Sequence, residues 1–176
     1  MIIRLATLND IDAIMQLIAQ VVPVMNASGN FQWDSTYPNA EVFKNDIMYQ
    51  QLWIAEVEGK VAGVTAITTD QEDEYRHAGM DTSQIAIVTH RLAVGLDYRG
   101  MRIAQLLLNQ AEVVARERGI DILRIDTNSN NKATRKLFPK LGYEFTGETA
   151  FKFRPNLRFY CYEKVLGGEM GTGFNK

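Results

Sequence analysis

A strand, a short turn and a long amphipathic helix follow one another in the second half of the chain, and this succession constrains the fold most. Residues 85–94 are rich in β-branched side chains, which favour a strand. Residues 101–119, MRIAQLLLNQAEVVARERG, then repeat their apolar side chains at helical spacing. A further strand is expected at 120–126 and a further helix at 131–140. Strands that alternate with helices indicate parallel pairing through crossover helices, and therefore an α/β domain.

The N-terminal part predicts two helices after a short strand. A β-type run at 2–5 precedes Thr7 and Asp10, whose spacing resembles a capping box at the start of a helix. Apolar residues then recur on one helical face until Pro23 disturbs the pattern. The following loop contains three aromatic residues, and a second helix is expected at 40–49.

The middle of the chain predicts a β-hairpin and an exposed connection. Strands at 52–57 and 61–68 flank Glu58-Gly59-Lys60, where glycine suits the positive φ of a tight turn, so they should pair antiparallel. Residues 70–83 are polar and acidic, and we expect them to be exposed. Two last strands are expected, one that begins at 143–145 and one at 157–165.

Composition excludes several classes of function. The chain has 19 Lys plus Arg against 21 Asp plus Glu, so no strong field draws it to nucleic acid or to an anionic membrane. The single cysteine, Cys161, and two histidines cannot build a usual zinc site, and no metal is expected. The N-terminus has no signal-peptide pattern, and no apolar run approaches membrane-spanning length. We therefore expect a cytoplasmic protein with no membrane or nucleic-acid partner.

The turn between the central strand and the long helix is a candidate phosphate site. The backbone N–H groups at a helix N-terminus are unpaired donors that bind anions well. Glycine allows close approach of a ligand, and two arginines add positive charge. The residues of this turn are Arg99, Gly100, Met101, Arg102, Ile103 and Ala104.

This turn resembles the acyl-coenzyme A signature of the GNAT N-acetyltransferases, Arg/Gln-x-x-Gly-x-Gly/Ala. Arg99, Arg102 and Ala104 stand at its fixed positions, and Arg102 departs from the family's glycine. Asn131, seven residues before Phe138, and the following Lys-Leu-Gly-Tyr also resemble a segment of that family. The resemblance runs from about residue 2 to residue 166 and implies acetyl-CoA as cosubstrate.

The resemblance implies an α/β fold in a single domain at 1–166, followed by a flexible tail at 167–176. Its sheet is expected to be mixed and mostly antiparallel, with about seven strands and about four helices. The sheet should be splayed after Val94, where main-chain groups would pair with the pantetheine amides. The backbone N–H of Val94 would polarise the acetyl carbonyl. The implied cofactor-binding residues also include Leu92, Ala93, Asn131 and Phe138.

The catalytic groups are less defined by the sequence. Many members of the family have a tyrosine acid where this chain has Phe138, so either another group such as Tyr143 protonates the thiolate or no acid is needed. His90 shares side-chain parity with Val88, Leu92 and Val94 and is a candidate base. The alternative is that His90 has a structural or substrate-positioning role.

Trp33, Tyr37 and Tyr75 are candidates for an acceptor pocket, although core packing is the alternative. Acidic residues such as Asp34 and Glu72 could attract a cationic amine, or form a solvated face. The predicted function is acetyl transfer to a primary amine of a small molecule or peptide, and a homodimer is left open. A non-catalytic acyl-CoA sensor is the alternative, and a Rossmann enzyme is disfavoured because no G-x-G-x-x-G follows the first strand.

Overall fold

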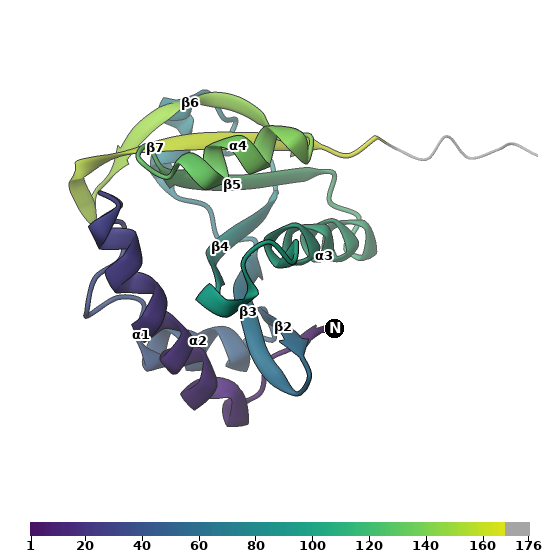
Figure 1. Ribbon diagram of the computed structural model, residues 1–176. Helices are drawn as coiled ribbons and strands as arrows, with labels where there is room; N and C mark the ends of the chain where they lie inside the picture. Colours follow the sequence, from purple (N-terminus) through teal and green to yellow (C-terminus); the bar gives the residue numbers. More distant parts are fainter. Residues whose placement is uncertain (168–176) are drawn as a thin grey trace, which may run out of the picture.

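The computed structural model describes residues 1–167 and contains a seven-stranded sheet with four α-helices (Figure 1). Its strands are β1 (Ile2–Leu5), β2 (Leu52–Val57), β3 (Lys60–Thr68), β4 (Ile87–Val94), β5 (Ile122–Asn128), β6 (Glu144–Phe151) and β7 (Arg154–Val165). Its helices are α1 (Ile11–Ala27), α2 (Ala40–Met48), α3 (Ile103–Glu117) and α4 (Lys132–Lys140), with short 3-10 turns η1 (Leu8–Asp10), η2 (Asp73–Ala78) and η3 (Leu96–Tyr98). The predicted α/β fold and strand number are confirmed, and all of the predicted tail except Gly167 lies outside the described residues.

The strands are arranged in the order β1-β2-β3-β4-β5-β7-β6. Only the pair β4 and β5 is parallel, and α3 is the crossover between them. The expectation of further parallel pairing after β5 is wrong, because β6 and β7 form an antiparallel hairpin and β7 lies between β6 and β5. The strands of the β6–β7 hairpin are joined by a tight turn and pair with each other, so no crossover helix is needed between them.

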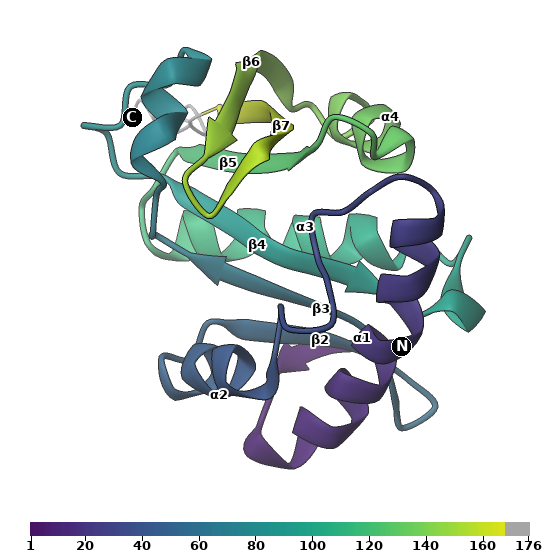
Figure 2. The same ribbon diagram turned by 90° about the vertical axis from the view of Figure 1, so that its left-hand side faces the viewer.

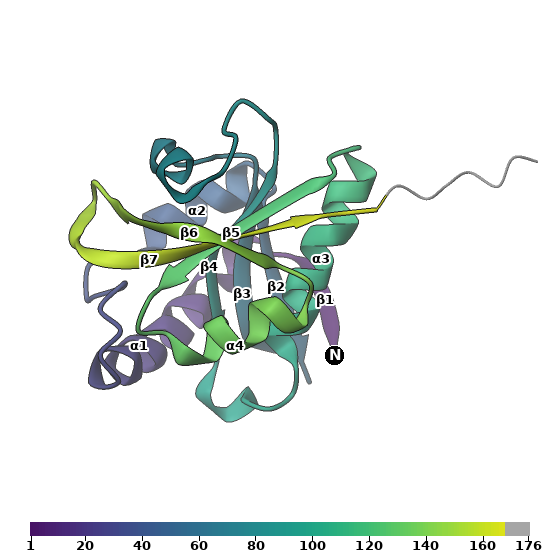
Figure 3. The ribbon, with the colours of Figure 1, turned by 90° about the horizontal axis from the view of Figure 1, so that it is seen from above.

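Helices cover the two faces of the sheet. α1 and α2 lie on one side of the central strands and α3 on the other (Figure 3). One apolar cluster joins α1 to β2 and β3 through Ile14, Leu17 and Ile54. Another joins α3 to β4 and β5 through Leu108 and Ile125. Alternate residues of the same strands therefore belong to different cores.

α3 approaches β3 closely because Gly63 has no side chain. A Cβ atom added at Gly63 would lie 2.6 Å from Ile103 Cγ2 and 3.2 Å from Leu107 Cδ1. No pair of carbon atoms tolerates the first distance, so glycine sets how near the first turn of α3 can come to the sheet. The position of the α3 N-terminus follows from this contact.

The local signals before and within the first hairpin are confirmed, with one exception. The Thr7 N–H donates to Asp10 Oδ2 at 2.7 Å, which is the predicted capping box. Glu58 and Gly59 both have positive φ, so the hairpin turn places two left-handed residues where the sequence indicated one. α1 continues through Pro23 to Ala27, because Pro23 is exposed and the hydrogen bond that it removes lies on the solvent side.

The helical segment Leu8–Ala27 has a mean hydropathy of 1.2 over a window of membrane-spanning length. Its apolar residues are explained by the sheet, since Ile14, Leu17 and Ile18 are buried in the core. Length and composition at this level are shared by core helices and membrane spans.

The connection at 70–83 is not wholly exposed as predicted. It contains η2, in which Tyr75 and Ala78 are buried, and Met80 follows them into the same cluster. These side chains pack against Phe151 and Phe159 of the β6–β7 hairpin. Tyr75 and Ala78 form a buried i, i+3 pair within an acidic segment. Two residues are too few to give a detectable helical period.

Candidate functional site

The sheet opens between its two parallel strands. β4 and β5 pair only through Ile87↔Leu123, Val88↔Arg124 and Thr89↔Ile125, after which the strands diverge (Figure 2). The opening therefore begins just after Thr89, not after Val94 as predicted. The main chain of β4 from His90 to Val94 has no strand partner on the side that faces β5.

A β-bulge lies in β4 at the start of this opening. His90 pairs with Ala66 and Ala93 pairs with Val64, so β4 has one more residue than β3 across this interval. Arg91 has a φ of 55°, in the left-handed region. The bulge reverses the alternation of side chains beyond it.

The predicted parity of His90 holds for Val88, before the bulge, and is wrong for Leu92 and Val94, after it. Leu92 and Val94 contact the α3 cluster, whereas Ala93 belongs to the α1 cluster. His90 lies on the same side as Val88 and Arg91, which face α2 and η2. We call the side of α3 and α4 the cofactor face and the side of α1, α2 and η2 the acceptor face.

The main-chain N–H of Val94 points into the opening. The Gly95 N–H donates to Ala62 O at 2.9 Å, so residues 95 and 62 form a hydrogen-bonded pair. In an antiparallel ladder the next pair, Val94 and Gly63, is then a non-hydrogen-bonded one. The N–H of Val94 is thus directed away from β3 and towards β5.

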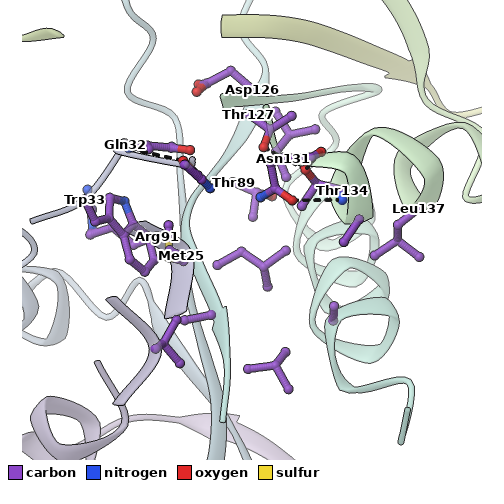
Figure 4. Close-up of a pocket in the computed structure, with 18 of the residues that line it drawn as sticks. Met25, Gln32, Trp33, Thr89, Arg91, Asp126, Thr127, Asn131, Thr134 and Leu137 are labelled. Atoms are coloured by element: carbon purple, nitrogen blue, oxygen red, sulfur yellow. Dashed lines mark hydrogen bonds between the residues drawn. The ribbon is translucent and has the colours of Figure 1, made fainter. Parts of the chain in front are cut away.

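A cavity of about 1110 Å³ occupies the opening (Figure 4). Every predicted cofactor-binding residue except the exposed Met101 lines it, as do His90, Trp33 and Tyr37. Figure 4 shows Trp33 and Arg91 on one side of the cavity and Thr127 and Asn131 on the other. The cavity therefore connects the cofactor face with the acceptor face.

The N-terminus of α3 presents free donors at one end of the cavity. Within residues 1–167, the backbone N–H groups of Gly100, Arg102, Ile103, Ala104 and Gln105 donate to no other backbone group. Gly100 has a φ of 83° and Arg102 a φ of 60°. Arg102 thus holds the left-handed conformation that suits the glycine of the family signature, and its N–H remains available to an anion.

The N-terminus of α4 lies across the opening. Asn131 is its N-cap, and the Asn131 side-chain oxygen accepts the Thr134 N–H at 3.3 Å. The Thr134 and Thr127 hydroxyls are 2.7 Å apart, which ties α4 to the end of β5. Phe138 is 1% exposed, contacts Tyr162 in an edge-on arrangement and forms part of the apolar wall.

His90 lines the acceptor side of the cavity. Its Nε2 lies 3.0 Å from the main-chain oxygen of Asp70, so Nε2 carries a proton and donates it in this bond. Burial, followed by the nearby Arg91 charge, lowers the pKa of His90 to about 4. His90 is therefore neutral at pH 7, and its Nδ1 is a weak base.

Asp126, near the end of β5, lines the cavity, and no catalytic role was predicted for it. The Tyr75 hydroxyl donates to Asp126 Oδ2 at 2.6 Å, and no cation pairs with this carboxylate within residues 1–167. Burial raises the pKa of Asp126 to about 6, in spite of the hydrogen bond from Tyr75. The signal in the sequence was its place at the carboxyl end of a strand flanking a parallel opening.

Thr89 is the last residue before the opening, and it is 3% exposed. Within residues 1–167 its hydroxyl has no hydrogen-bond partner, although it lines the cavity. A buried hydroxyl without a partner is costly, so a ligand in the cavity would satisfy it.

The roof of the acceptor side consists of segments that are far apart in the chain. Arg154 of the β6–β7 hairpin donates to Asp34 Oδ2 at 2.7 Å and to the Gln32 main-chain oxygen at 3.3 Å. Trp33 lies between these residues and is 5% exposed. Asp34 is therefore occupied by a protein cation and is not free to attract an amine.

Two predicted residues are not brought to the cavity. Tyr75 is fully buried beneath Asp126 and packs edge-on against Phe151. Tyr143 is buried beside Phe138, and its hydroxyl has no partner within residues 1–167. Burial raises the pKa of Tyr143 well above its ordinary value, which disfavours its ionisation.

Comparisons with known proteins agree with this geometry. Residues 20–143 match the model of the Acetyltransferase (GNAT) family. The chain is 29% identical to the Probable N-acetyltransferase camello of Xenopus tropicalis over 94 residues, which is 52% of this chain and 37% of that protein. A GNAT-family acetyltransferase from Streptococcus agalactiae superimposes with a TM-score of 0.77 at 26% identity, over 94% of this chain and 95% of that one.

A less similar structure shows the same fold with a ligand. An N-acetyltransferase from Thermoplasma acidophilum, crystallised in complex with coenzyme A, superimposes with a TM-score of 0.69 at 16% identity. The superposition covers 93% of this chain and 98% of that one.

Proposed function

The chain belongs to the GNAT family of acetyltransferases, and from that premise we propose that it transfers the acetyl group of acetyl-CoA to a primary amine. The observation that carries the proposal is the continuous cavity, which joins free helix donors on the cofactor face to titratable groups on the acceptor face. Both substrates can reach the same stretch of β4 from opposite sides.

The residues of the cofactor face fit coenzyme A. The free N–H groups at the start of α3, with Arg99 and Arg102, suit a pyrophosphate. The unpaired main chain of β4 suits an extended chain of amides, and the wall around Leu92 and Phe138 suits its methylene groups. When bound, acetyl-CoA supplies an activated acetyl thioester. The inward-pointing N–H of Val94 would donate to the thioester oxygen as the amine attacks.

We assign removal of the amine proton to Asp126. A carboxylate whose pKa is about 6 is ionised at pH 7 and is a stronger base than His90, whose pKa is about 4. Asp126 Oδ1 has no hydrogen-bond partner within residues 1–167, so it is free to accept a proton. His90 instead positions the acceptor loop through its bond to Asp70.

A protein acid for the leaving thiolate is not required by this scheme. Phe138 has no proton to give, and Tyr143 does not line the cavity. Coenzyme A leaves as a stable thiolate that takes its proton from solvent.

The proposal is tested by titrating acetyl-CoA into the protein calorimetrically and by following thiol release with a panel of amines. Arg99→Ala should weaken acetyl-CoA affinity about tenfold, because one phosphate contact is lost. Arg118→Ala, at the far end of α3, is the matched control and should leave the affinity unchanged. Equal affinity in Arg99→Ala would remove the assigned phosphate site. Cofactor binding without thiol release for any amine would favour the sensor.

A further inference from the structure

The charged residues that line the cavity are sorted by sign, apart from Arg91, which lies on the acceptor face and is paired with Asp46. The cations Arg99, Arg102 and Lys132 lie at the N-termini of α3 and α4, on the cofactor face. The carboxylates Asp70 and Glu72 lie before η2, on the acceptor face, with Asp126 at the end of β5. A ligand that spans the cavity thus meets positive charge at one end and negative charge at the other.

Within residues 1–167, no cation forms an ion pair with the carboxylates at the acidic end. The side chains of Asp70 and Glu72 form no hydrogen bond or ion pair within residues 1–167, and Asp126 accepts only from the neutral Tyr75. Burial and the neighbouring carboxylates, with Glu74 the largest among them, raise the pKa of Glu72. These residues repel one another, and a bound cation would relieve the repulsion.

The charge of Arg91 partly offsets the raised pKa of Glu72, but the Arg91 guanidinium pairs with Asp46 and not with the cavity carboxylates. Its Nη2 and Nε donate to the two carboxylate oxygens of Asp46 at 2.7 and 2.8 Å. Asp46 is 2% exposed and belongs to α2, so this pair is buried and neutral as a unit. His90, the other basic group nearby, is uncharged at pH 7 for the reason given above.

Two further features suit a flexible aliphatic cation. Trp33 and Tyr37 line the same end of the cavity, and aromatic faces attract ammonium groups. The unpartnered Thr89 hydroxyl lies between the two faces and can accept a hydrogen bond from an amine. Both features indicate a bound ligand independently of the acidic side chains.

We propose that the acceptor is an aliphatic amine with a second positive charge, whose distal ammonium binds Asp70 and Glu72 while its reacting nitrogen faces Asp126. This inference rests on the proposed acetyl transfer for the identity of the reacting nitrogen. Amines that carry a carboxylate near the nitrogen are disfavoured at this site, because they would meet three acidic side chains.

The inference is tested with two amines of equal length, 1,4-diaminobutane and n-butylamine, titrated calorimetrically into the full chain at pH 7.5 with and without coenzyme A. The diamine should bind at least tenfold more tightly than the monoamine, because only the diamine can place one nitrogen at the distal carboxylates and the other at Asp126 at the same time. Glu72→Gln should lower diamine affinity about tenfold and lower monoamine affinity by a smaller factor. Asp73→Asn removes an exposed neighbouring charge that does not line the cavity, and diamine affinity should not change.

Equal affinities for the two amines, or no binding of the diamine, would each overturn the inference. Measuring thiol release distinguishes failure of the charge inference from failure of the proposed acetyl transfer. Selective diamine binding without release of coenzyme A supports the charge inference and refutes the transfer. Release at equal kcat/KM with both amines supports the transfer and refutes the charge inference.

Discussion

Replacing Asp126 with asparagine should stabilise the protein at alkaline pH and not at acid pH. Burial raises the pKa of this carboxyl from its ordinary value of 3.8 to about 6 in the folded chain. The folded state therefore holds the proton more tightly than the unfolded state, and wild-type stability falls as the pH rises from about 4 to about 6. Each pH unit corresponds to about 1.4 kcal/mol, so the ionised form costs up to about 3 kcal/mol. Water in the cavity reduces this, and we expect about 1–3 kcal/mol.

Asparagine keeps the shape of the side chain and an oxygen that accepts from Tyr75, so the substitution isolates the charge. The other groups that face Asp126 are Glu72 and Cys161, both unchanged in the variant. Urea unfolding of both proteins at pH 4, 5, 6, 7 and 8 measures the effect. The stability of Asp126→Asn relative to wild type should rise by about 1–3 kcal/mol between pH 4 and pH 8. A relative stability that is flat across this range would refute the raised pKa.

The same variant tests the catalytic assignment. The wild-type kcat/KM should fall below about pH 6, where Asp126 becomes protonated. Asp126→Asn should lose most activity and this acid limb together, while His90→Gln should retain the limb. If the acid limb of the pH profile disappears in His90→Gln and persists in Asp126→Asn, then His90 and not Asp126 is the base. A gain in stability with a loss of turnover is the signature of a group kept for function.

Two further substitutions test how the cofactor turn is positioned. Gly63→Ala should destabilise the fold by about 1–3 kcal/mol, because its Cβ would lie 2.6 Å from Ile103 Cγ2, and an unchanged urea midpoint would show that α3 can move away freely. Arg102→Gly should raise stability by about 0.5–1 kcal/mol, because glycine relieves the left-handed backbone at φ 60° at some cost in chain entropy, and a lower midpoint in urea would contradict this reading.

Local signals in the sequence predicted most elements of the fold. The capping box at Thr7, the glycine turn at Gly59 and the apolar stripe of α3 each depend on residues within one or two turns of chain. Such patterns need no knowledge of distant contacts. The turn before α3 was predicted for the same reason, because a strand followed by arginine, glycine and a helix defines its own donors.

The bulge at Arg91 was not predicted, because it adds one residue to β4 only relative to β3. The pattern of apolar and polar side chains at 85–94 does not show which residue is left without a partner on the neighbouring strand. The bulge changes the facing of every later residue of β4, and it turned Leu92 and Val94 to the face opposite His90. The pairing of Tyr75 with Asp126 joins residues 51 apart and was equally invisible. The order of β5, β7 and β6 likewise depends on which strand of the last hairpin pairs with β5, and this is a long-range contact.

The bulge also assigns consecutive residues of β4 to different sides of the cavity. Leu92 and Val94 lie on the cofactor face, whereas Arg91 pairs with α2 on the acceptor face and Ala93 packs in the core beneath α1. Neighbouring residues of one strand therefore contact opposite sides of the cavity. We expect substitutions at Leu92 or Val94 to act on one end of the cavity and substitutions at Arg91 to act on the other.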